Sequence, residues 1–224
     1  MSEARKNRDI VFNEKPPKPI IPKSLPEKPT ILDISPIELA RQLTVIESKL
    51  YRDIKPWECL NQSWAKKEKD KRAPRVIAMI NRFNQVSNWV ATIVVQADPL
   101  KNRIAVMKHV IEVANQCLLL NNFNAVMEII SGLQASSVYR LKLTREGLDS
   151  KHTKMLEECQ RIMERTQNFK NFRQHLHSVD PPSIPYLGSF LPLPLRLRPP
   201  FSFSFMHFSS SSLLLPFIWV IPPK

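Results

Sequence analysis

The sequence predicts an all-α protein, an orthogonal helical bundle with irregular N- and C-terminal tails. Only three glycines occur among its 224 residues, too few for the tight turns of an all-β sandwich. Between residues 35 and 187, apolar residues recur at three- and four-residue spacing, the period of an amphipathic helix. Prolines and capping residues stand where several of these patterns begin. The pattern shows no internal repeat.

The first predicted helix begins after Ser35. The residues Ser-Pro-Ile-Glu at 35–38 have the pattern of a capping box, with proline at the first helical position. The apolar stripe that we expect this helix to bury consists of Leu39, Leu43, Ile46 and Leu50.

Two long helices are predicted next, and a proline opens each of them. Pro74 begins the second helix and Pro99 begins the third. The apolar positions of the second helix are Ile77, Ile80, Phe83, Trp89, Val90 and Ile93. Those of the third helix are Ile104, Met107, Val110, Ile111, Ala114, Cys117 and Leu118.

The fourth helix lies within the segment NNFNAVMEIISGLQASSVYRL, residues 121–141. Asn122 or Asn124 can cap it, because asparagine is a favoured N-cap residue. Its apolar face holds Phe123, Val126, Met127, Ile130 and Leu133.

Two further helices complete the predicted bundle. One is rich in Glu and Lys and lies around residues 149–165, and the other spans residues 168–178. The expected buried residues of the pair are Met155, Leu156, Cys159, Ile162, Phe169, Phe172 and Leu176. His175 and His177 stand two residues apart and so point to different faces of the last helix, which argues against a metal site.

Both ends of the chain differ from this pattern. Residues 1–33 are expected to be a linker, since six prolines lie between Pro16 and Pro29 among Lys and Glu. Residues 189–224 contain seven prolines and no acidic residue, and we interpret them as an aberrant or disordered tail. The apolar run Leu213–Ile221 is far shorter than the ~20 residues of a membrane-spanning helix. The predicted domain is therefore residues 34–188.

Composition narrows the function further. The net charge of +13 favours an acidic partner or an anionic membrane surface, but much of it lies in the N-terminal stretch and in KKEKDKR at 66–72. No nucleic-acid-binding motif accompanies the charge, so we expect no nucleic-acid partner. Neither GxGxxG nor GxxxxGK[ST] occurs, so no direct nucleotide binding through such loops is expected. Three scattered cysteines and a charged, polar start without a signal peptide favour a cytoplasmic protein.

Four ordered blocks resemble the catalytic domain of Ras-type guanine-nucleotide exchange factors of the Son-of-sevenless-like kind. They are IELARQLTVIESKLYRDIKPWECLNQSW (37–64), RVIAMINRFNQVSNWV (75–90), the NNFNAVMEIISGLQASSVYRL segment continued to residue 150, and DPPSIPYLG (180–188). The resemblance implies a regulator that promotes GDP release from a Ras-like small GTPase. Such a factor binds the nucleotide-free GTPase better than the loaded one, without covalent chemistry, a cofactor or a catalytic residue, so we do not expect an enzyme in that sense.

The resemblance also implies a GTPase-binding site. The family holds a switch II tyrosine of the GTPase in an apolar pocket, and the matching positions here are Ile80, Met127, Phe169 and Tyr186. Asn81 stands where relatives carry Arg, and Gln134 stands where relatives carry Asn. Without the resemblance, the apolar members of this set would be interpreted as core residues. Glu47 and Trp64 are expected to brace the bundle.

The chain departs from the family after PYLG. The family continues with a helical hairpin that disturbs the phosphate and Mg²⁺ site of the GTPase, whereas SFLPLPLRLRPPF has no acid and no helical pattern. We therefore expect the chain to hold the switch II platform in roughly the first three-fifths of the domain, with impaired exchange. The alternative is a non-catalytic helical module that binds a small GTPase or a scaffold. The resemblance further implies recruitment to the inner face of a membrane through the GTPase.

Overall fold

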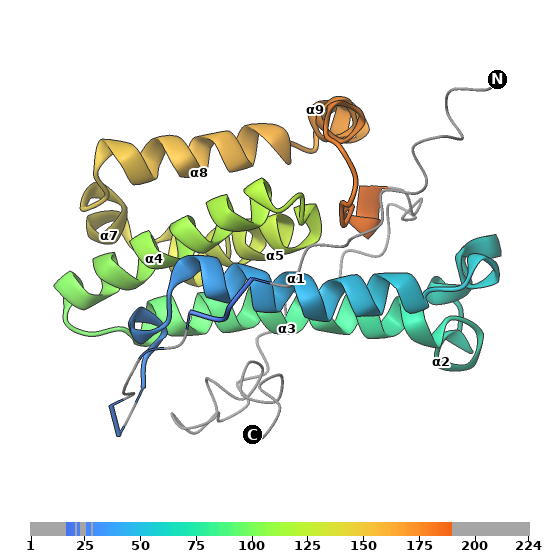
Figure 1. Cartoon of the computed structure of the whole chain (residues 1–224), viewed down its shortest axis with the longest axis horizontal. Coiled ribbons are helices and arrows are strands. Elements are labelled where there is room, and N and C mark those ends of the chain that lie inside the picture. The colour runs from blue at the N-terminus through green and yellow to red at the C-terminus, as the bar shows by residue number, and fades with distance from the viewer. Residues whose placement is uncertain (1–16, 21, 23–25, 28, 190–224) are drawn as a thin grey trace.

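The computed structural model describes residues 17–20, 22, 26, 27 and 29–189. Within these residues the chain is a bundle of helices with no strand, as the sequence predicts (Figure 1). Most of the expected linker (1–16 and scattered positions to 28) and nearly all of the expected tail (190–224) lie outside the described residues.

The elements follow the predicted order, with short additions. The long helices are α1 (Pro36–Asp53), α3 (Pro74–Gln96), α4 (Leu100–Leu119), α5 (Phe123–Leu133), α8 (Ser150–Ile162) and α9 (Thr166–Ser178). The short helices α2 (Lys69–Arg72), α6 (Ser136–Tyr139) and α7 (Lys142–Glu146), and the 3-10 segments η2 (Ile31–Asp33), η3 (Pro56–Ala65) and η4 (Leu187–Ser189), were not predicted as separate elements.

Helix α5 forms the centre of the bundle. Ten of its eleven residues are buried, and it packs against α3 and α4. Helices α1 and α3 lie side by side along the length of the molecule, while α9 is seen almost end-on and therefore crosses them (Figure 1). The central position explains why α5 is apolar on nearly every side, since a helix surrounded by others has no solvent face.

The observed N-termini of the helices can be compared with the predicted caps. Asn122 caps α5, because its Oδ1 accepts a hydrogen bond from the backbone N–H of Ala125 at 3.1 Å. Asn124 is not a cap: its side chain is buried beside Glu47 and Glu128. Pro74 is the first residue of α3, and Pro99 is the residue just before α4.

The capping box predicted at residues 35–38 is wrong. Ser35 is the N-cap residue of α1, but its side chain makes no capping bond. The Glu38 carboxylate instead accepts hydrogen bonds from the side-chain amide of Gln42 at 2.8 Å and from the backbone N–H of Ile20 at 3.1 Å. A segment before the helix thus competes for the carboxylate that the local pattern assigns to the cap.

The buried face of α1 also differs from the predicted stripe. Leu39 and Leu43 are buried, whereas Ile46 and Leu50 are only partly buried. Ala40 and Glu47 lie in the core with the two leucines, because α1 packs against both α4 and α3. Glu47 therefore braces the bundle as expected, as a fully buried carboxyl group.

A second, smaller core lies where α3 begins, beside η3 and α2. Its buried residues are Trp64, Ala73 and Val76, with Ile54, Cys59, Ala65, Ile77, Ile80 and Leu187 packed around them. Trp64 braces this part of the fold, in agreement with the sequence interpretation. Ile31, which we placed in the linker, is buried in the main core.

The start of α9 is irregular. Gln167, Asn168 and Phe169 have φ values of 47°, 55° and 58°, so regular helix begins only after the positive-φ residues. No helix in the described part of the chain combines the length and apolarity that a bilayer crossing requires.

Candidate functional site: an aromatic cluster and a neighbouring hollow

Three aromatic side chains meet where the chain returns after α9. The ring of Tyr186 lies 5.4 Å from the Phe169 ring and 5.7 Å from the Phe83 ring, centroid to centroid. These separations are typical of favourable aromatic pairs. The cluster combines two predicted site residues with Phe83 of α3, which the sequence interpretation assigned to the core. Phe83 lies one turn after Ile80 and so shares its face, a signal that was present in the sequence.

Tyr186 is held in place by backbone hydrogen bonds to the start of α5. The N–H of Ile184 donates to the carbonyl of Asn121 at 2.9 Å, and the N–H of Phe123 donates to the carbonyl of Ile184 at 2.9 Å. The Asn121 side-chain amide donates to the carbonyl of Asp180 at 3.1 Å. The segment after α9 is thereby fixed against the centre of the bundle, and Tyr186 is presented from a firm backbone.

Tyr186 also depends on a glycine. A Cβ atom at Gly188 would collide with the Tyr186 hydroxyl and ring, so a larger residue there would force the ring to shift. Burial raises the pKa of Tyr186, with the nearby Arg165 opposing that rise. The hydroxyl therefore remains protonated at neutral pH and can donate a hydrogen bond.

Ile80 and Asn81 lie on α3 at the edge of the aromatic cluster. Ile80 is partly buried and packs against the smaller core, as does Leu187, the residue after Tyr186. Asn81 is exposed. Ile80 thus shares the smaller core with the residue that follows Tyr186, whereas Asn81 lies at the surface.

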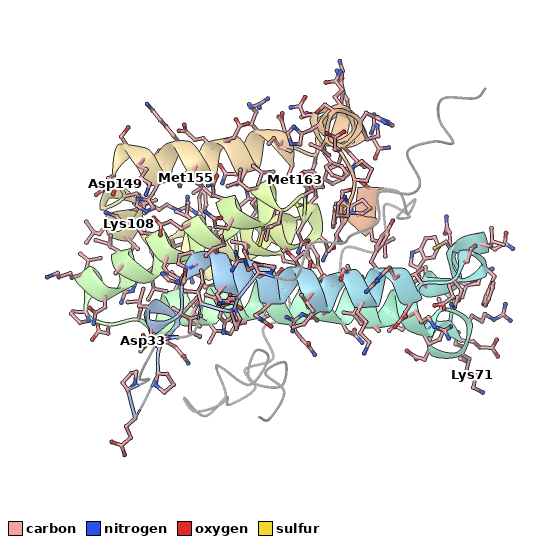
Figure 2. All side chains as sticks on the ribbon, viewed as in Figure 1. Asp33, Lys71, Lys108, Asp149, Met155 and Met163 are labelled. Carbon is pink, nitrogen blue, oxygen red and sulfur yellow. The ribbon has the colours of Figure 1, made fainter. Side chains whose placement is uncertain are left out.

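Met127 and Gln134 line a hollow of about 370 Å³ between α5 and the end of α8. Met127 is 2% exposed, so it forms the floor, whereas Gln134 is exposed at the rim. Figure 2 shows Met163 where α8 ends, above α5. The remaining lining residues are Ile130, Glu157, Gln160, Arg161, Met163, Glu164 and Arg165.

Arg165 connects the hollow to the aromatic cluster. It lines the hollow, and its charge acts on Tyr186. The structure therefore brings Phe169 and Tyr186 together and places Met127 and Gln134 on a separate hollow, while Ile80 packs against the smaller core. The sequence interpretation missed Arg165, since nothing in its local pattern shows that the α8–α9 turn reaches Tyr186.

Among the six predicted site residues, Tyr186 alone has an ionisable side chain. They are aromatic, aliphatic or amide groups, with cations and carboxylates only around the hollow. In the part of the chain that the structure describes, no three His, Cys, Asp or Glu side chains gather as a metal site would require. The ring of His175 instead packs edge-on against Phe123, with centroids 5.6 Å apart.

Comparison with known proteins identifies this fold. The profile of the family described as "RasGEF domain" matches residues 38–193. The chain belongs to the RasGEF domain family. It is similar to Ras guanine nucleotide exchange factors E and A of Dictyostelium discoideum, at 49% identity over 184 residues and 47% over 182. It is also 35% identical over 169 residues to Protein son of sevenless of Drosophila melanogaster.

These similarities cover most of this chain but a small part of each relative. They span 80%, 81% and 75% of the chain, against 18%, 30% and 10% of the three relatives in the same order. The chain therefore corresponds to less than a third of the length of these proteins. The activity of the full-length relatives is accordingly proposed for this chain below.

Beneath the site, this RasGEF domain holds a buried polar network. The Asn124 side-chain amide donates to Glu128 at 2.8 Å and to Glu47 at 3.3 Å, which joins α5 to α1. Burial raises the pKa of both carboxyl groups, and that of Glu128 is raised well above its usual range because Glu47 adds like charge. Arg82 of α3 opposes both shifts. Both shifts favour the neutral carboxyl group, and more strongly at Glu128, the residue after Met127 of the hollow.

Arg145 packs at the C-terminal end of α5 in this RasGEF domain. Its guanidinium donates to the carbonyl of Leu133 at 3.0 Å and lies 4.8 Å from the centroid of the Tyr139 ring. A cation at the C-terminal end of α5 is favourable there, because the last carbonyls of a helix carry partial negative charge. Arg145 therefore contributes to packing at the end of the helix that carries Met127.

Proposed function

We propose that this RasGEF domain binds a Ras-like small GTPase at its switch II region and promotes release of GDP. The observation that carries the proposal is the Tyr186–Phe169 pair, held by backbone hydrogen bonds beside the hollow of Met127 and Gln134. Aromatic anchors with a neighbouring apolar depression have the properties of an interface hot spot. The relatives' names, which describe Ras guanine nucleotide exchange factors, support the same partner class.

Each side chain has a distinct role in the proposed contact. Ile80, Phe169 and Tyr186 supply the apolar surface for an inserted aromatic residue of the GTPase. Gln134 provides an amide that both donates and accepts hydrogen bonds at the rim. Arg165 supplies a positive charge between the two groups.

The proposed mechanism is differential binding. A surface that binds the open, nucleotide-free GTPase more tightly than the loaded form shifts the population toward the open form, and GDP leaves as a consequence. No bond in the nucleotide is made or broken by the domain. A rigid platform assists because it loses little conformational freedom on association.

We further propose that residues 34–188 act as the docking unit and that this chain alone exchanges nucleotide poorly. The residues after Gly188 contain no acidic side chain, so they do not supply the charge that the family uses to disturb the Mg²⁺ site. On this proposal the GTPase also brings the domain to the inner face of a membrane.

A pair of measurements on the 224-residue chain tests the function. Affinity for the nucleotide-free GTPase is measured beside fluorescent GDP release. Tyr186→Ala should weaken the affinity by about tenfold or more, because it removes a partly buried aromatic anchor. The matched control is Leu143→Ala, since Leu143 is 66% exposed on α7 and away from the site. Equal affinity of the two variants would reject the assigned site.

The release measurement separates the proposal from its alternative. We expect binding that prefers the nucleotide-free state, with GDP release raised only severalfold over the intrinsic rate. A chain that binds the GDP-loaded and empty forms equally would be a non-catalytic interaction module, because equal affinity shifts no equilibrium.

A further inference from the structure

One end of the molecule combines exposed apolar side chains with a basic segment. It is formed by η3 and α2, at the far end of the α1–α3 pair from α7 (Figure 1). Trp57 and Leu60 of η3 are 62% and 61% exposed. They stand three residues apart in Pro56–Ala65, just where the backbone leaves helical geometry at Leu60 (φ -83°, ψ 146°). Two large apolar side chains left exposed so near each other in the chain make this end a candidate contact surface.

The outward position of Trp57 is imposed by its neighbour. The Glu58 side chain is fully buried and accepts hydrogen bonds from the backbone N–H groups of Arg75 and Val76 at 2.8 and 3.2 Å. It also pairs with the Arg75 guanidinium at 2.9 Å. Since Glu58 points into the first turn of α3, the adjacent Trp57 is presented on a firm backbone.

The basic segment is α2 with the residues before it. Residues 66–72 contain five basic and two acidic side chains, all exposed. Arg72 pairs with Glu68 at 2.9 Å. Across the described residues no ion pair engages Lys66, Lys67, Lys69 or Lys71, and Figure 2 shows Lys71 at the outer edge of this end.

We propose that the η3–α2 end, defined by Trp57, Leu60 and the lysines of residues 66–71, docks on an anionic lipid bilayer. Tryptophan is favoured at the boundary between headgroups and acyl chains, where its ring is buried while its N–H stays hydrated. Leucine adds apolar area at the same depth, and lysines on long stems reach anionic headgroups.

The shape of this end favours a bilayer over a protein or a nucleic acid. The η3–α2 end projects at one end of the α1–α3 pair (Figure 1). A protruding end fits a diffuse layer of headgroups. The interspersed Glu68 and Asp70 disfavour close tracking of a phosphate backbone but are tolerated above a fluid surface.

The proposed surface adjoins the candidate functional site without depending on its function. Ile80 and Leu187 pack against the same small core that supports η3 and α2. A bilayer bound at this end would therefore lie next to the aromatic cluster. Vesicle binding is measured with no GTPase present, so its outcome is separate from that of the proposed exchange function.

The test is sedimentation of the full chain with vesicles of phosphatidylcholine alone or with a third of phosphatidylserine. We expect binding only to the anionic vesicles, weakening as salt rises. Trp57→Ser with Leu60→Ser should lower the partition coefficient by about tenfold or more, because it removes the inserted apolar area. Changing Lys66, Lys67, Lys69 and Lys71 to Gln should lower it by at least as much, since each lysine near an anionic surface contributes severalfold.

Matched controls keep the number and kind of changes constant. Leu119→Ser with Leu143→Ser removes two residues that are 70% and 66% exposed elsewhere. The second control changes Lys101, Lys142, Lys154 and Lys170 to Gln, four exposed lysines outside this end. Both should bind vesicles like the parent chain. Equal losses of vesicle binding in the test and control variants, or no loss in either, would overturn the proposal. It would also be overturned if the parent chain did not bind vesicles and the test variants instead lost binding to an oligonucleotide.

Discussion

Gly132 permits the closest approach between the two central helices. A Cβ atom at this position would lie 2.6 Å from the backbone carbonyl oxygen of Ser87 and 2.7 Å from the Cβ of Val90. Both atoms belong to α3 and neither can move without the helix. The small residue thus sets the spacing of α3 and α5, and with it the distance between Ile80 and Met127 of the candidate site.

Gly132→Ala should therefore destabilise the domain by about 2–3 kcal/mol, because the extra methyl forces the helices apart. Urea unfolding followed by circular dichroism measures the loss. Gly147→Ala is the control: its Cβ would meet side-chain atoms of Ile104 and no backbone atom, so a side-chain shift can relieve the contact without moving a helix. A loss at Gly132 no larger than that at Gly147 would show that α3 and α5 have room to separate.

Glu128 predicts an unusual pH dependence of stability. The folded protein keeps a proton on Glu128 that the unfolded chain releases near its ordinary pKa, because burial and Glu47 raise the folded pKa. The contribution of this group is fully present below the unfolded pKa and is lost as pH rises toward the folded value. Glu128→Gln keeps the shape and the neutral charge, so it should remove this loss.

The measurement is the free energy of unfolding from about pH 5 to about pH 8. Its fall with pH should be shallower in Glu128→Gln than in the parent chain, by up to about 1.4 kcal/mol per pH unit for one proton. Glu146→Gln, at an exposed position, should leave the slope unchanged. Parallel curves for all three chains would mean that Glu128 is ionised in the folded protein.

Among the elements, α3 begins in an uncommon way. Pro74 is its first residue, and the free N–H groups of Arg75 and Val76 are satisfied by Glu58 from η3 rather than by a local cap. Burial opposes ionisation of Glu58, but these hydrogen bonds and the Arg75 side chain hold its pKa below the ordinary value. The carboxylate thereby joins η3 to α3 and supports the smaller core.

Glu58→Ala should cost about 1–2 kcal/mol of stability, the usual effect of losing a helix cap. Because the folded pKa is lowered, this contribution is present above the unfolded pKa and is lost as pH falls through the folded value. The advantage of the parent chain over the variant should therefore shrink on acidification in thermal unfolding. Glu68→Ala removes only an exposed ion pair with Arg72 and should change stability by about 0.5 kcal/mol or less.

Helices α4 and α8 are joined by a different device. His152 lies between two carboxylates, with Nδ1 2.6 Å from Asp149 and Nε2 3.2 Å from Glu112. Lys108 and Lys151 complete the group, with ammonium nitrogens 2.9 and 3.1 Å from these same two acids. Figure 2 shows Lys108 and Asp149 together at the end of the bundle near α7. Hydrogen bonds to His152 and Lys108 hold the pKa of Asp149 well below its ordinary value, which keeps this junction charged.

Across the whole molecule, stability should be unevenly distributed. Helix α5 is buried almost throughout, whereas no residue of α2 is buried. Opening α5 requires the disruption of the main core, while α2 can open alone. Hydrogen exchange followed by mass spectrometry should therefore find the slowest amides in α5 and fast exchange in α2. Comparable rates in both helices would imply that the domain opens only as one unit.

How well the sequence predicted each part of the fold depended on how far apart in the chain the interacting residues stand. An asparagine cap at residue 122 or 124 and the start of α3 at Pro74 were predicted because a few neighbouring residues decide them, and the structure chooses Asn122. The capping box at residues 35–38 failed because Ile20, which is outside the helix, takes the carboxylate of Glu38. The irregular start of α9 at Gln167 was missed because only Asn168 has a local preference for positive φ, whereas Gln167 and Phe169 have none.

The candidate site shows the same division. Ile80, Met127, Phe169 and Tyr186 were selected by resemblance to a family, and their roles in binding remain predictions. Their arrangement required contacts between distant segments, above all the pairing of Ile184 with the start of α5. Phe83 shares a helix face with Ile80 and was within reach of sequence reasoning. Arg165 was not, because its position depends on the turn between α8 and α9.

Helical periodicity, proline placement and low glycine content were sufficient to define an all-α chain, since secondary structure here follows from spacing along a single segment. They were also sufficient to show which residues prefer burial. Only the packed structure decided that Glu47 meets Glu128 inside the core, that Tyr186 meets Phe169, and that Trp57 faces outward. The physical reason is that these outcomes depend on the competition of many segments for the same partners, which periodicity along one segment does not record.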